Sequence, residues 1–306
     1  MAPRILQIGC GQWGKNVLRD LVELGASVTV LARSEATAER ARAGGAAAVV
    51  SSVDEAGTVE GAVVVTPAPH HAEAIEGLAP LGVPIFCEKP LVTDPADGRR
   101  LLELCGERLF VMHKWRWHPG IEALARLASD GTLGEPAGVR SHRLGWGPFH
   151  FQVDSVDTLA PHDLSIAIAV LGELPPVAVA SGSRYPGLEG GWADCSALLA
   201  RDGGPYVELA CSSVSAHRVR RVEVVGSTGS ATLKDPEASE VEVLVHGGDL
   251  DRPPELDTVP LEPEWPLLRE LRDFVAHCEG GPPPRASGAE GVAVVQAIAE
   301  LRAALG

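Results

Sequence analysis

The sequence is poor in aromatic side chains, in long apolar runs and in clustered positive charge. Of its 306 residues only 4% are aromatic, and no apolar run approaches the ~18 residues that a membrane-spanning helix needs. The formal net charge is −15, and no run of basic residues is longer than a pair. Because this charge repels phosphate backbones and anionic lipid surfaces, we expect neither a nucleic-acid partner nor a membrane.

Paired cysteines are also missing. The six cysteines occur singly, without Cys-x-x-Cys spacing, at positions 10, 87, 105, 195, 211 and 278. This pattern is typical of reduced thiols and favours neither a disulfide framework nor a metal site. Met1 to Arg4 runs directly into a strand pattern, so we expect no signal peptide and a soluble, cytoplasmic protein.

A glycine-rich turn follows the first predicted strand, residues 4–8. Its sequence is Gly9-Cys-Gly11-Gln12-Trp13-Gly14, and a helical pattern with one apolar face comes next. Strand, Gly-x-Gly-x-x-Gly and helix in this order predict dinucleotide binding. Gly9 permits the tight turn, Gly11 lets a pyrophosphate approach the backbone, and Gly14 lets helix and strand pack closely. The alternative is an ordinary glycine-rich turn.

The end of the second predicted strand, residues 27–31, bears on cofactor choice. Sites that prefer NAD usually carry an Asp or Glu there, which binds the ribose 2′-hydroxyl. This sequence has Ala32, followed by Arg33 and Ser34. A guanidinium and a hydroxyl suit a 2′-phosphate, so we expect NADP(H) to be preferred over NAD(H). The alternative for Arg33 is a solvated surface side chain.

Strands continue to alternate with helices as far as residue 112, which predicts a doubly wound parallel sheet. Ligands of such sheets bind beyond the carboxyl ends of the strands. Four residues of interest fall at predicted strand ends, namely Gly9, Arg33, Thr66 and Lys89. We therefore expect one crevice to hold them all.

Lys89 stands out because it follows an apolar run and precedes a proline, in Phe86-Cys-Glu88-Lys89-Pro90-Leu91. Proline restricts the residue before it to extended geometry, so Lys89 should leave the strand end in a defined direction. An amine at the end of a buried strand is costly unless it has a task or a partner. Catalysis is one interpretation, and a surface ion pair with Glu88 is the other.

The amino-acid composition changes after His113. Aromatic and histidine side chains gather in the next segment, as Trp115, Trp117, His118, His142, Trp146, Phe149, His150 and Phe151. Seven strand-like runs between 138 and 245 then predict an antiparallel meander, and two helices, about 267–278 and 289–304, close the chain. The fold class is thus α/β: an N-terminal Rossmann domain (1–116) and a C-terminal α+β domain (117–306) with an open-faced, mostly antiparallel sheet.

His162 lies in Pro161-His162-Asp163, just before an apolar helical run, residues 166–171. A proline and an acid at this place are typical of a helix start. A histidine at a helix start that faces a cleft is a candidate acid–base group. The alternative is that His162 and Asp163 only cap the helix.

Several ordered motifs together resemble the Gfo/Idh/MocA oxidoreductases, a family named for glucose–fructose oxidoreductase and inositol dehydrogenase. The resemblance covers nearly the whole chain, and Glu-Lys-Pro is its most specific part. It is carried by Gly9-x-Gly11-x-x-Gly14, Thr66-Pro67 with His71, Glu88-Lys89-Pro90, Arg116-Trp117-His118-Pro119, Gly131-Thr-Leu-Gly134, His162 before an apolar helix ending in Leu-Gly, and Val222-Glu-Val-Val-Gly226-Ser-Thr-Gly229.

The resemblance implies an NAD(P)-dependent oxidoreductase that moves hydride to or from a sugar, cyclitol, diol or related small molecule, without a metal, and that forms dimers or tetramers through the C-terminal sheet. It implies that Lys89 polarises the substrate oxygen and that His162 is the acid or base. The implied cofactor contacts are Gly9, Gly11, Gln12, Trp13, Gly14, Arg33, Ser34, Thr66, Pro67, His71, Glu88 and Lys89. The implied substrate contacts are Lys89, Arg116, Trp117, Trp146, Thr158 and His162.

Two departures from the family pattern surround His162. Many members carry an acid four residues before this histidine and another three after it, where this sequence has Thr158 and Ser165. Aromatic faces pack equally well on pyranose C–H groups and on planar rings, so a cyclic imine or a diol is an alternative substrate. A different class, a catalytically silent regulator that senses the cofactor, is disfavoured because Lys89 and His162 are both present.

Overall fold

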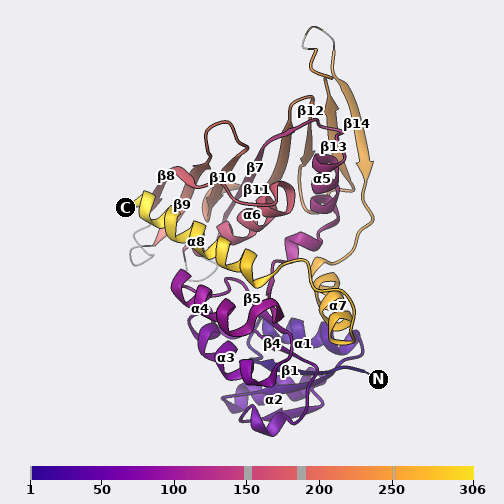
Figure 1. The fold of residues 1–306 in the computed structure, drawn as a ribbon, viewed down its shortest axis with the longest axis vertical. Helices are drawn as coiled ribbons and strands as arrows, with labels where there is room; N and C mark the ends of the chain where they lie inside the picture. The colour runs from indigo at the N-terminus through magenta and orange to yellow at the C-terminus, as the bar shows by residue number, and fades with distance from the viewer. Residues whose placement is uncertain (1, 148–153, 185–190, 250, 252) are drawn as a thin grey trace. The chain divides into compact units, whose positions relative to one another are not determined.

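The structure is a computed structural model that describes residues 2–147, 154–184, 191–249, 251 and 253–306. The chain forms two compact units (Figure 1). The first comprises Met1–Lys114 and Trp265–Val295, and the second comprises Trp115–Glu264 and Gln296–Gly306. None of the helices within the described ranges is both long enough and apolar enough to cross a membrane.

The first unit is built on six parallel strands in the order β3-β2-β1-β4-β5-β6. This order confirms the predicted doubly wound sheet. The strands are β1 (Arg4–Ile8), β2 (Ser27–Leu31), β3 (Ala48–Val50), β4 (Gly61–Val64), β5 (Ile85–Glu88) and β6 (Leu109–Met112). Its helices are α1 (Gly14–Glu23), α2 (Glu35–Ala43), α3 (His71–Leu78), α4 (Pro95–Cys105), α7 (Pro266–Cys278) and the first part of α8 (Gly288–Leu305).

Helix α7 joins this unit from the far end of the sequence. It packs on α1, and Figure 1 shows the two side by side, one near the yellow and one near the indigo end of the colour scale. Phe274 of α7 stacks on Phe86 of β5, with ring centroids 5.1 Å apart. A helix from near the end of the sequence therefore completes the unit that contains the first strands.

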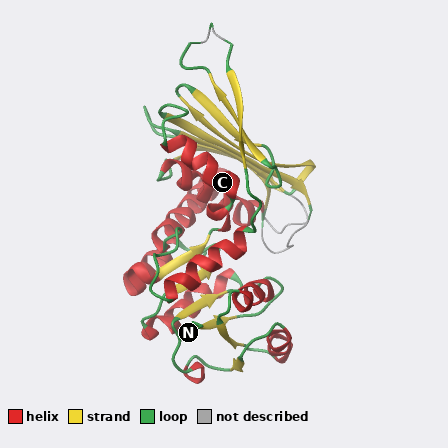
Figure 2. Ribbon diagram, turned by 90° about the vertical axis from the view of Figure 1, so that its right-hand side faces the viewer, coloured by secondary structure: helices red, strands yellow, loops and turns green. Residues whose placement is uncertain are grey.

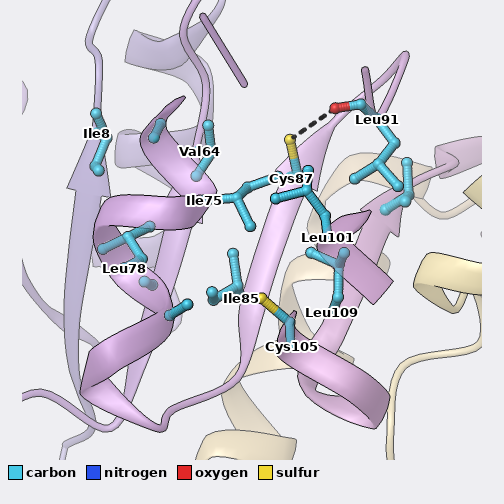
Figure 3. Close-up of a cluster of buried hydrophobic side chains, with 14 of the residues drawn as sticks. Ile8, Val64, Ile75, Leu78, Ile85, Cys87, Leu91, Leu101, Cys105 and Leu109 are labelled. Atoms are coloured by element: carbon cyan, nitrogen blue, oxygen red, sulfur yellow. Dashed lines mark hydrogen bonds between the residues drawn. The ribbon is translucent and has the colours of Figure 1, made fainter. Parts of the chain in front are cut away.

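A cluster of fully buried side chains lies between the sheet and helices α3 and α4 (Figure 3). Strand residues alternate between the two faces, so Ile85 and Cys87 of β5 point to the same side. There they meet Ile75 of α3 and Leu101 of α4, all 0% exposed. This packing fixes β5, whose last residue immediately precedes Lys89.

The second unit is built on eight strands in the order β14-β13-β12-β11-β7-β10-β9-β8. The strands are β7 (Pro136–Trp146), β8 (Val177–Arg184), β9 (Trp192–Leu199), β10 (Tyr206–Ser212), β11 (Val214–Gly226), β12 (Gly229–Leu233), β13 (Glu240–Val245) and β14 (Glu255–Pro260). The sheet is mostly antiparallel, as expected. The predicted simple meander is wrong, because β7 lies in the middle and pairs in parallel with β10.

Helices α5 (Pro119–Ser129) and α6 (Ser155–Leu171) pack against this sheet. Figure 2 shows the helices of the second unit gathered on one side of its strands. The apolar residues of α5, such as Leu124 and Leu127, meet Val222 and Val224 of β11 in one core. Several apolar side chains of the sheet are exposed, among them Val179 of β8 and Leu198 of β9, which agrees with an open-faced sheet.

Helix α6 begins earlier than the sequence predicts. Pro161 was expected near the helix start, but it lies inside the helix, which begins at Ser155 with Asp154 as its cap. Asp154 Oδ1 accepts a hydrogen bond from the backbone N–H of Asp157 at 3.1 Å. An interior proline costs a backbone hydrogen bond, and burial of Val156, Leu159 and Ala160 offsets this cost. His162 consequently lies in mid-helix, and its expected position at a helix start is wrong.

Candidate active site

The glycine loop between β1 and α1 has the shape that a dinucleotide needs. Gly9 has φ +93°, a backbone conformation that other residues rarely adopt. A Cβ on Gly14 would lie 3.1 Å from the Gly9 carbonyl oxygen, a distance at which the loop would have to shift by a few tenths of an ångström, so glycine favours this close packing. A Cβ on Gly11 would meet nothing within 4 Å. The space beside Gly11 therefore fits an approaching pyrophosphate.

The start of α1 is available to an anion. Its capping residue, Trp13, makes no side-chain cap hydrogen bond, and no acid lies in the first turn. Free N–H groups at a helix start bind phosphate oxygens. The amide of Gln7 donates to the carbonyl oxygens of Gly9 at 2.8 Å and Gly14 at 3.0 Å, which fixes the loop from below. Sequence reasoning did not identify Gln7, because it reads as an ordinary strand residue.

Arg33 and Ser34 lie just beyond β2, as predicted. The Arg33 guanidinium forms an ion pair with Glu73 of α3 at 2.8 Å, and both side chains are about two-thirds exposed, at 67% and 65%. Ser34 caps α2, since its hydroxyl accepts a hydrogen bond from the backbone N–H of Thr37 at 3.3 Å. Arg40 of α2 donates to the carbonyl oxygen of Cys10 at 2.6 Å. Two guanidinium groups thus lie near the carboxyl ends of β1 and β2.

His71 ties two strand-end loops together. Its Nε2 lies 2.8 Å from the carbonyl oxygen of Thr66, and its Nδ1 lies 2.9 Å from that of Pro90. Burial lowers the pKa of His71, while the carbonyls of Thr66, Pro90 and Leu91 act in the opposite direction. The side chain is 1% exposed. In this structure His71 holds the loop of Lys89 in place, and a direct contact with the cofactor stays a prediction.

Lys89 follows β5 directly and is joined to Pro90 by a cis peptide bond. The neighbouring Glu88 lies among positive groups. Burial raises the pKa of Glu88, and the charges of Lys89 and Lys114 and a hydrogen bond from the Trp13 indole oppose this rise. Lys89 thus lies beside a carboxyl group that is connected to the glycine loop. An ammonium at this place can polarise an oxygen of a bound substrate.

Two further residues of this cluster were not singled out from the sequence. The Nζ of Lys114 lies 5.0 Å from the ring centroid of Trp13, a cation–π contact. Glu270 of α7 is 1% exposed, and both Glu88 and Lys114 interact with it electrostatically. The periodicity of the sequence does not single out Glu270. It occupies a position on the buried face of an amphipathic helix, and the sequence does not show which elements pack against that face.

In the second unit, His162 lies beside an aromatic side chain. The rings of His162 and Trp115 meet edge to face, with centroids 6.3 Å apart and an interplanar angle of 64°. Trp115 also stacks on His118, with centroids 5.2 Å apart. His118 caps α5: its Nδ1 accepts a hydrogen bond from the Gly120 N–H at 3.1 Å, and its Nε2 lies 2.9 Å from the Pro236 carbonyl oxygen. These contacts show that His118 has a structural role. They also show that the His162 ring contacts the indole of Trp115.

A buried ion pair supports the same region. The guanidinium of Arg143 on β7 contacts the carboxylate of Asp163 on α6 at 2.9 to 3.1 Å, and the Ser141 hydroxyl donates to that carboxylate at 2.7 Å. Arg143 Cζ also lies 4.4 Å from the Trp115 ring centroid. Arg143 and Asp163 are 5% and 1% exposed. This pair joins helix and sheet next to His162, and Arg143 was not predicted.

The remaining predicted substrate residues occupy different environments. Trp117 is 0% exposed and belongs to the core, whereas Trp146, the last residue of β7, is 67% exposed. Arg116 and Thr158 are partly buried. His142 Nε2 lies 3.2 Å from Glu208 on the sheet. Three residues of the predicted aromatic cluster lie outside the described residues, namely Phe149, His150 and Phe151.

In the part of the chain that the structure describes, no three His, Cys, Asp or Glu side chains are grouped so as to hold a metal ion. The buried polar groups described above are instead amines, carboxyls and imidazoles. Such groups bind, orient and exchange protons with organic ligands.

Two family models match the chain one after the other. The first is described as an oxidoreductase family with an NAD-binding Rossmann fold and matches residues 4–113. The second is described as the GFO/IDH/MocA C-terminal domain and matches residues 121–232. Together they cover more than half of the sequence and correspond to the two sheets.

Similar proteins of known name share this organisation. D-apiose dehydrogenase of Paraburkholderia graminis is 29% identical over 92% of this chain and 82% of its own length. Inositol 2-dehydrogenase of Rhizobium meliloti is 26% identical over 83% of this chain and 82% of its own length. The solved UDP-N-acetylglucosamine 3-dehydrogenase of Acidithiobacillus ferrooxidans has the same fold, with a TM-score of 0.86 and 24% identity over 100% of this chain and 98% of that one. The chain therefore belongs to the GFO/IDH/MocA family of oxidoreductases.

Proposed function

We propose that this protein is an NADP-preferring oxidoreductase that transfers hydride between the nicotinamide and a hydroxyl or carbonyl carbon of a sugar or cyclitol. The observation that carries the proposal is the position of Lys89, an amine at the carboxyl end of β5. Its loop is held through Pro90 by the buried His71. The glycine loop that fits a pyrophosphate lies at the same edge of the sheet.

Each residue has a separate task in this proposal. The nicotinamide, when bound, supplies or accepts the hydride. The Lys89 ammonium donates a hydrogen bond to the substrate oxygen, which gains negative charge during reduction. His162 gives a proton to that oxygen in reduction and removes it in oxidation. Arg33 binds the 2′-phosphate by charge and by its paired donors.

Sugars and cyclitols are favoured as substrates by the relatives described above, which are named for apiose and inositol. The aromatic side chains do not decide between substrate classes, because aromatic faces pack equally well on the C–H groups of sugar rings and on planar rings.

The test is cofactor turnover with a panel of keto-sugars, sugars and cyclitols, with NADPH and NADH compared at equal concentration. We expect turnover with at least one carbohydrate and a lower KM for the phosphorylated cofactor. Lys89→Ala should lower kcat by about 10²–10³-fold, as loss of one oxyanion donor does, with little change in cofactor affinity. Lys234→Ala is the matched control, because Lys234 is an exposed lysine of β12–β13 that pairs with Glu242.

Three outcomes would contradict parts of the proposal. If Lys89→Ala kept most of its turnover, Lys89 would be structural. Reduction of cyclic imines or oxidation of diols, without activity on carbohydrates, would indicate the flatter substrate class. Binding of the cofactor without any turnover would indicate a sensor and not an enzyme.

A further inference from the structure

Glu270 is a carboxyl group without a full set of hydrogen bonds. It lies on α7 and is 1% exposed. Among the residues that the structure describes, no donor lies within hydrogen-bond distance of its Oε2. A buried carboxyl oxygen without a donor is costly, and a carboxylate much more so than a neutral acid. This position therefore favours a proton on Glu270.

The packing of α7 on β5 explains why Glu270 faces Glu88. Phe274 follows Glu270 by four residues, so both lie on one face of the helix. Phe86 precedes Glu88 by two residues, so both lie on one face of the strand. The stacked rings of Phe86 and Phe274, 5.1 Å apart at 25°, hold these two faces against each other, and the charge of Glu88 acts on Glu270.

Both carboxyls share one positive neighbour and are connected to the glycine loop. The charge of Lys114 acts on Glu88 and on Glu270. Its Nζ also lies 5.0 Å above the Trp13 ring, and the Trp13 indole donates to Glu88. When both carboxyls are ionised, Glu88, Glu270 and Lys114 together carry a net charge of −1. When one of the two carboxyls is protonated, the three side chains are neutral together.

Burial and the neighbouring charges determine how readily Glu88 and Glu270 lose their protons. Burial, and then the charge of Glu88, raise the pKa of Glu270 well above its ordinary value, and Lys114 opposes this. The charge of Lys89 also acts on Glu88. Helix α1, which packs on α7, contributes Asp20, but that carboxylate pairs with Arg19 at 2.6 Å. The pair Glu88–Glu270 therefore keeps a proton to higher pH than an ordinary carboxyl group does and loses it as the pH rises further.

We propose that Glu88 and Glu270 form a proton-sharing carboxyl pair that sets the preference of the site for the oxidised over the reduced dinucleotide. The proposal rests on the proposed function, because Lys89 at the reacting carbon places the nicotinamide next to Glu88. The oxidised ring carries one positive charge and the reduced ring carries none. The ionised pair attracts the positive ring, whereas the protonated pair does not distinguish the two forms. Binding of the oxidised form and loss of the proton then favour each other.

The experiment measures the dissociation constants of NADP⁺ and NADPH by calorimetry across the range from about pH 6 to about pH 9. For the unmodified protein we expect the affinity ratio to shift towards NADP⁺ by roughly fivefold to tenfold as the pH rises, as one unit charge about 10 Å away produces. Glu270→Gln keeps the shape but cannot ionise, so its ratio should stay near the low-pH value. Asp273→Asn removes an exposed carboxylate of the same helix, which pairs with Arg285, and should leave the shift intact.

Thermal unfolding of the cofactor-free protein gives an independent readout. A carboxyl whose pKa is raised by folding stabilises the fold least at high pH, because the unfolded state ionises more readily. Glu270→Gln should therefore raise Tm at about pH 8, and the difference should vanish towards the ordinary carboxyl pKa of about 4.3.

The possible results distinguish this inference from the proposed function on which it rests. The proposal of a carboxyl pair would be refuted if the ratio of NADP⁺ to NADPH affinity did not change with pH in the unmodified protein. It would also be refuted if this ratio changed equally in Glu270→Gln. Either result would leave the proposed function standing. Failure of both dinucleotides to bind would overturn the proposed function as well. If Glu270→Gln did not fold, the pH dependence of the unmodified protein would still decide the question.

Discussion

The guanidinium of Arg33 forms an exposed ion pair with Glu73, and in the proposed function a cofactor phosphate would compete with Glu73 for the same donors. A charge-assisted hydrogen bond is worth roughly 1.5–3 kcal/mol, so Arg33→Ala should weaken NADPH binding by about one to two decades. NADH affinity should hardly change. Fluorescence titration with both cofactors measures this, and Glu73→Gln, which releases Arg33, should strengthen NADPH binding slightly. Tighter binding of NADH than of NADPH by the unmodified protein would refute the preference.

His162 is the residue whose proposed task depends most on its protonation. In the reductive direction the imidazolium is the active form, so kcat/KM should fall as the pH rises through the titration of the histidine. His162→Asn should remove this inflection and slow the reaction by about 10²–10⁴-fold while NADPH still binds. The measurement is a pH profile of kcat/KM for both proteins. An inflection that survives the substitution would direct attention to His113, His118 or His142.

At the scale of elements, the buried pair Arg143–Asp163 joins α6 to β7. Removing one partner of a buried pair leaves the other charge uncompensated, so Asp163→Ala should cost about 3–5 kcal/mol of unfolding free energy. The double change Arg143→Met with Asp163→Leu should recover much of that loss. Urea unfolding measures both. As a control, Lys234→Ala breaks an exposed pair, 64% and 44% exposed, and should cost about 1 kcal/mol or less.

The first unit could be predicted closely because its signals are local. A glycine motif between a strand and a helix and the apolar runs of β5 and β6 each act within a few residues. The structure confirms that Lys89 directly follows the end of a strand. These features do not depend on what packs against them.

Features that depend on distant partners escaped prediction. Strand β14, Glu255–Pro260, has polar residues and a proline, and only its pairing with β13 makes it a strand. The first turns of α6 form despite Pro161 because buried neighbours and a contact of Arg302 with Asp154 and Asp157 support them. Glu270 gains its chemistry from Glu88, and no periodicity in the sequence indicates that these two residues meet.

At the scale of the whole molecule, the sheet of the second unit is where the family resemblance leads us to expect self-association. A groove on β11 to β14 is lined by charged and apolar side chains, including Arg221, Glu223 and Leu256, and Leu256 is 78% exposed. We expect a dimer through this sheet, so Leu256→Asp should shift the protein towards the monomer. Light scattering after size exclusion measures the mass. Leu104→Asp, at an exposed position of α4, is the control, and a monomeric unmodified protein would contradict the expectation.

The return of α7 to the first unit has a consequence for synthesis on the ribosome. All six strands of that unit are made before Trp115–Glu264, whereas α7 emerges only afterwards. At 5–20 residues per second the interval is roughly 8 to 30 s. Throughout it, Phe86 lacks the ring of Phe274 that covers it in the finished protein. The nascent chain therefore carries an uncovered apolar strand face for as long as elongation lasts, and its exposure to chaperones and to aggregation is set by the speed of translation.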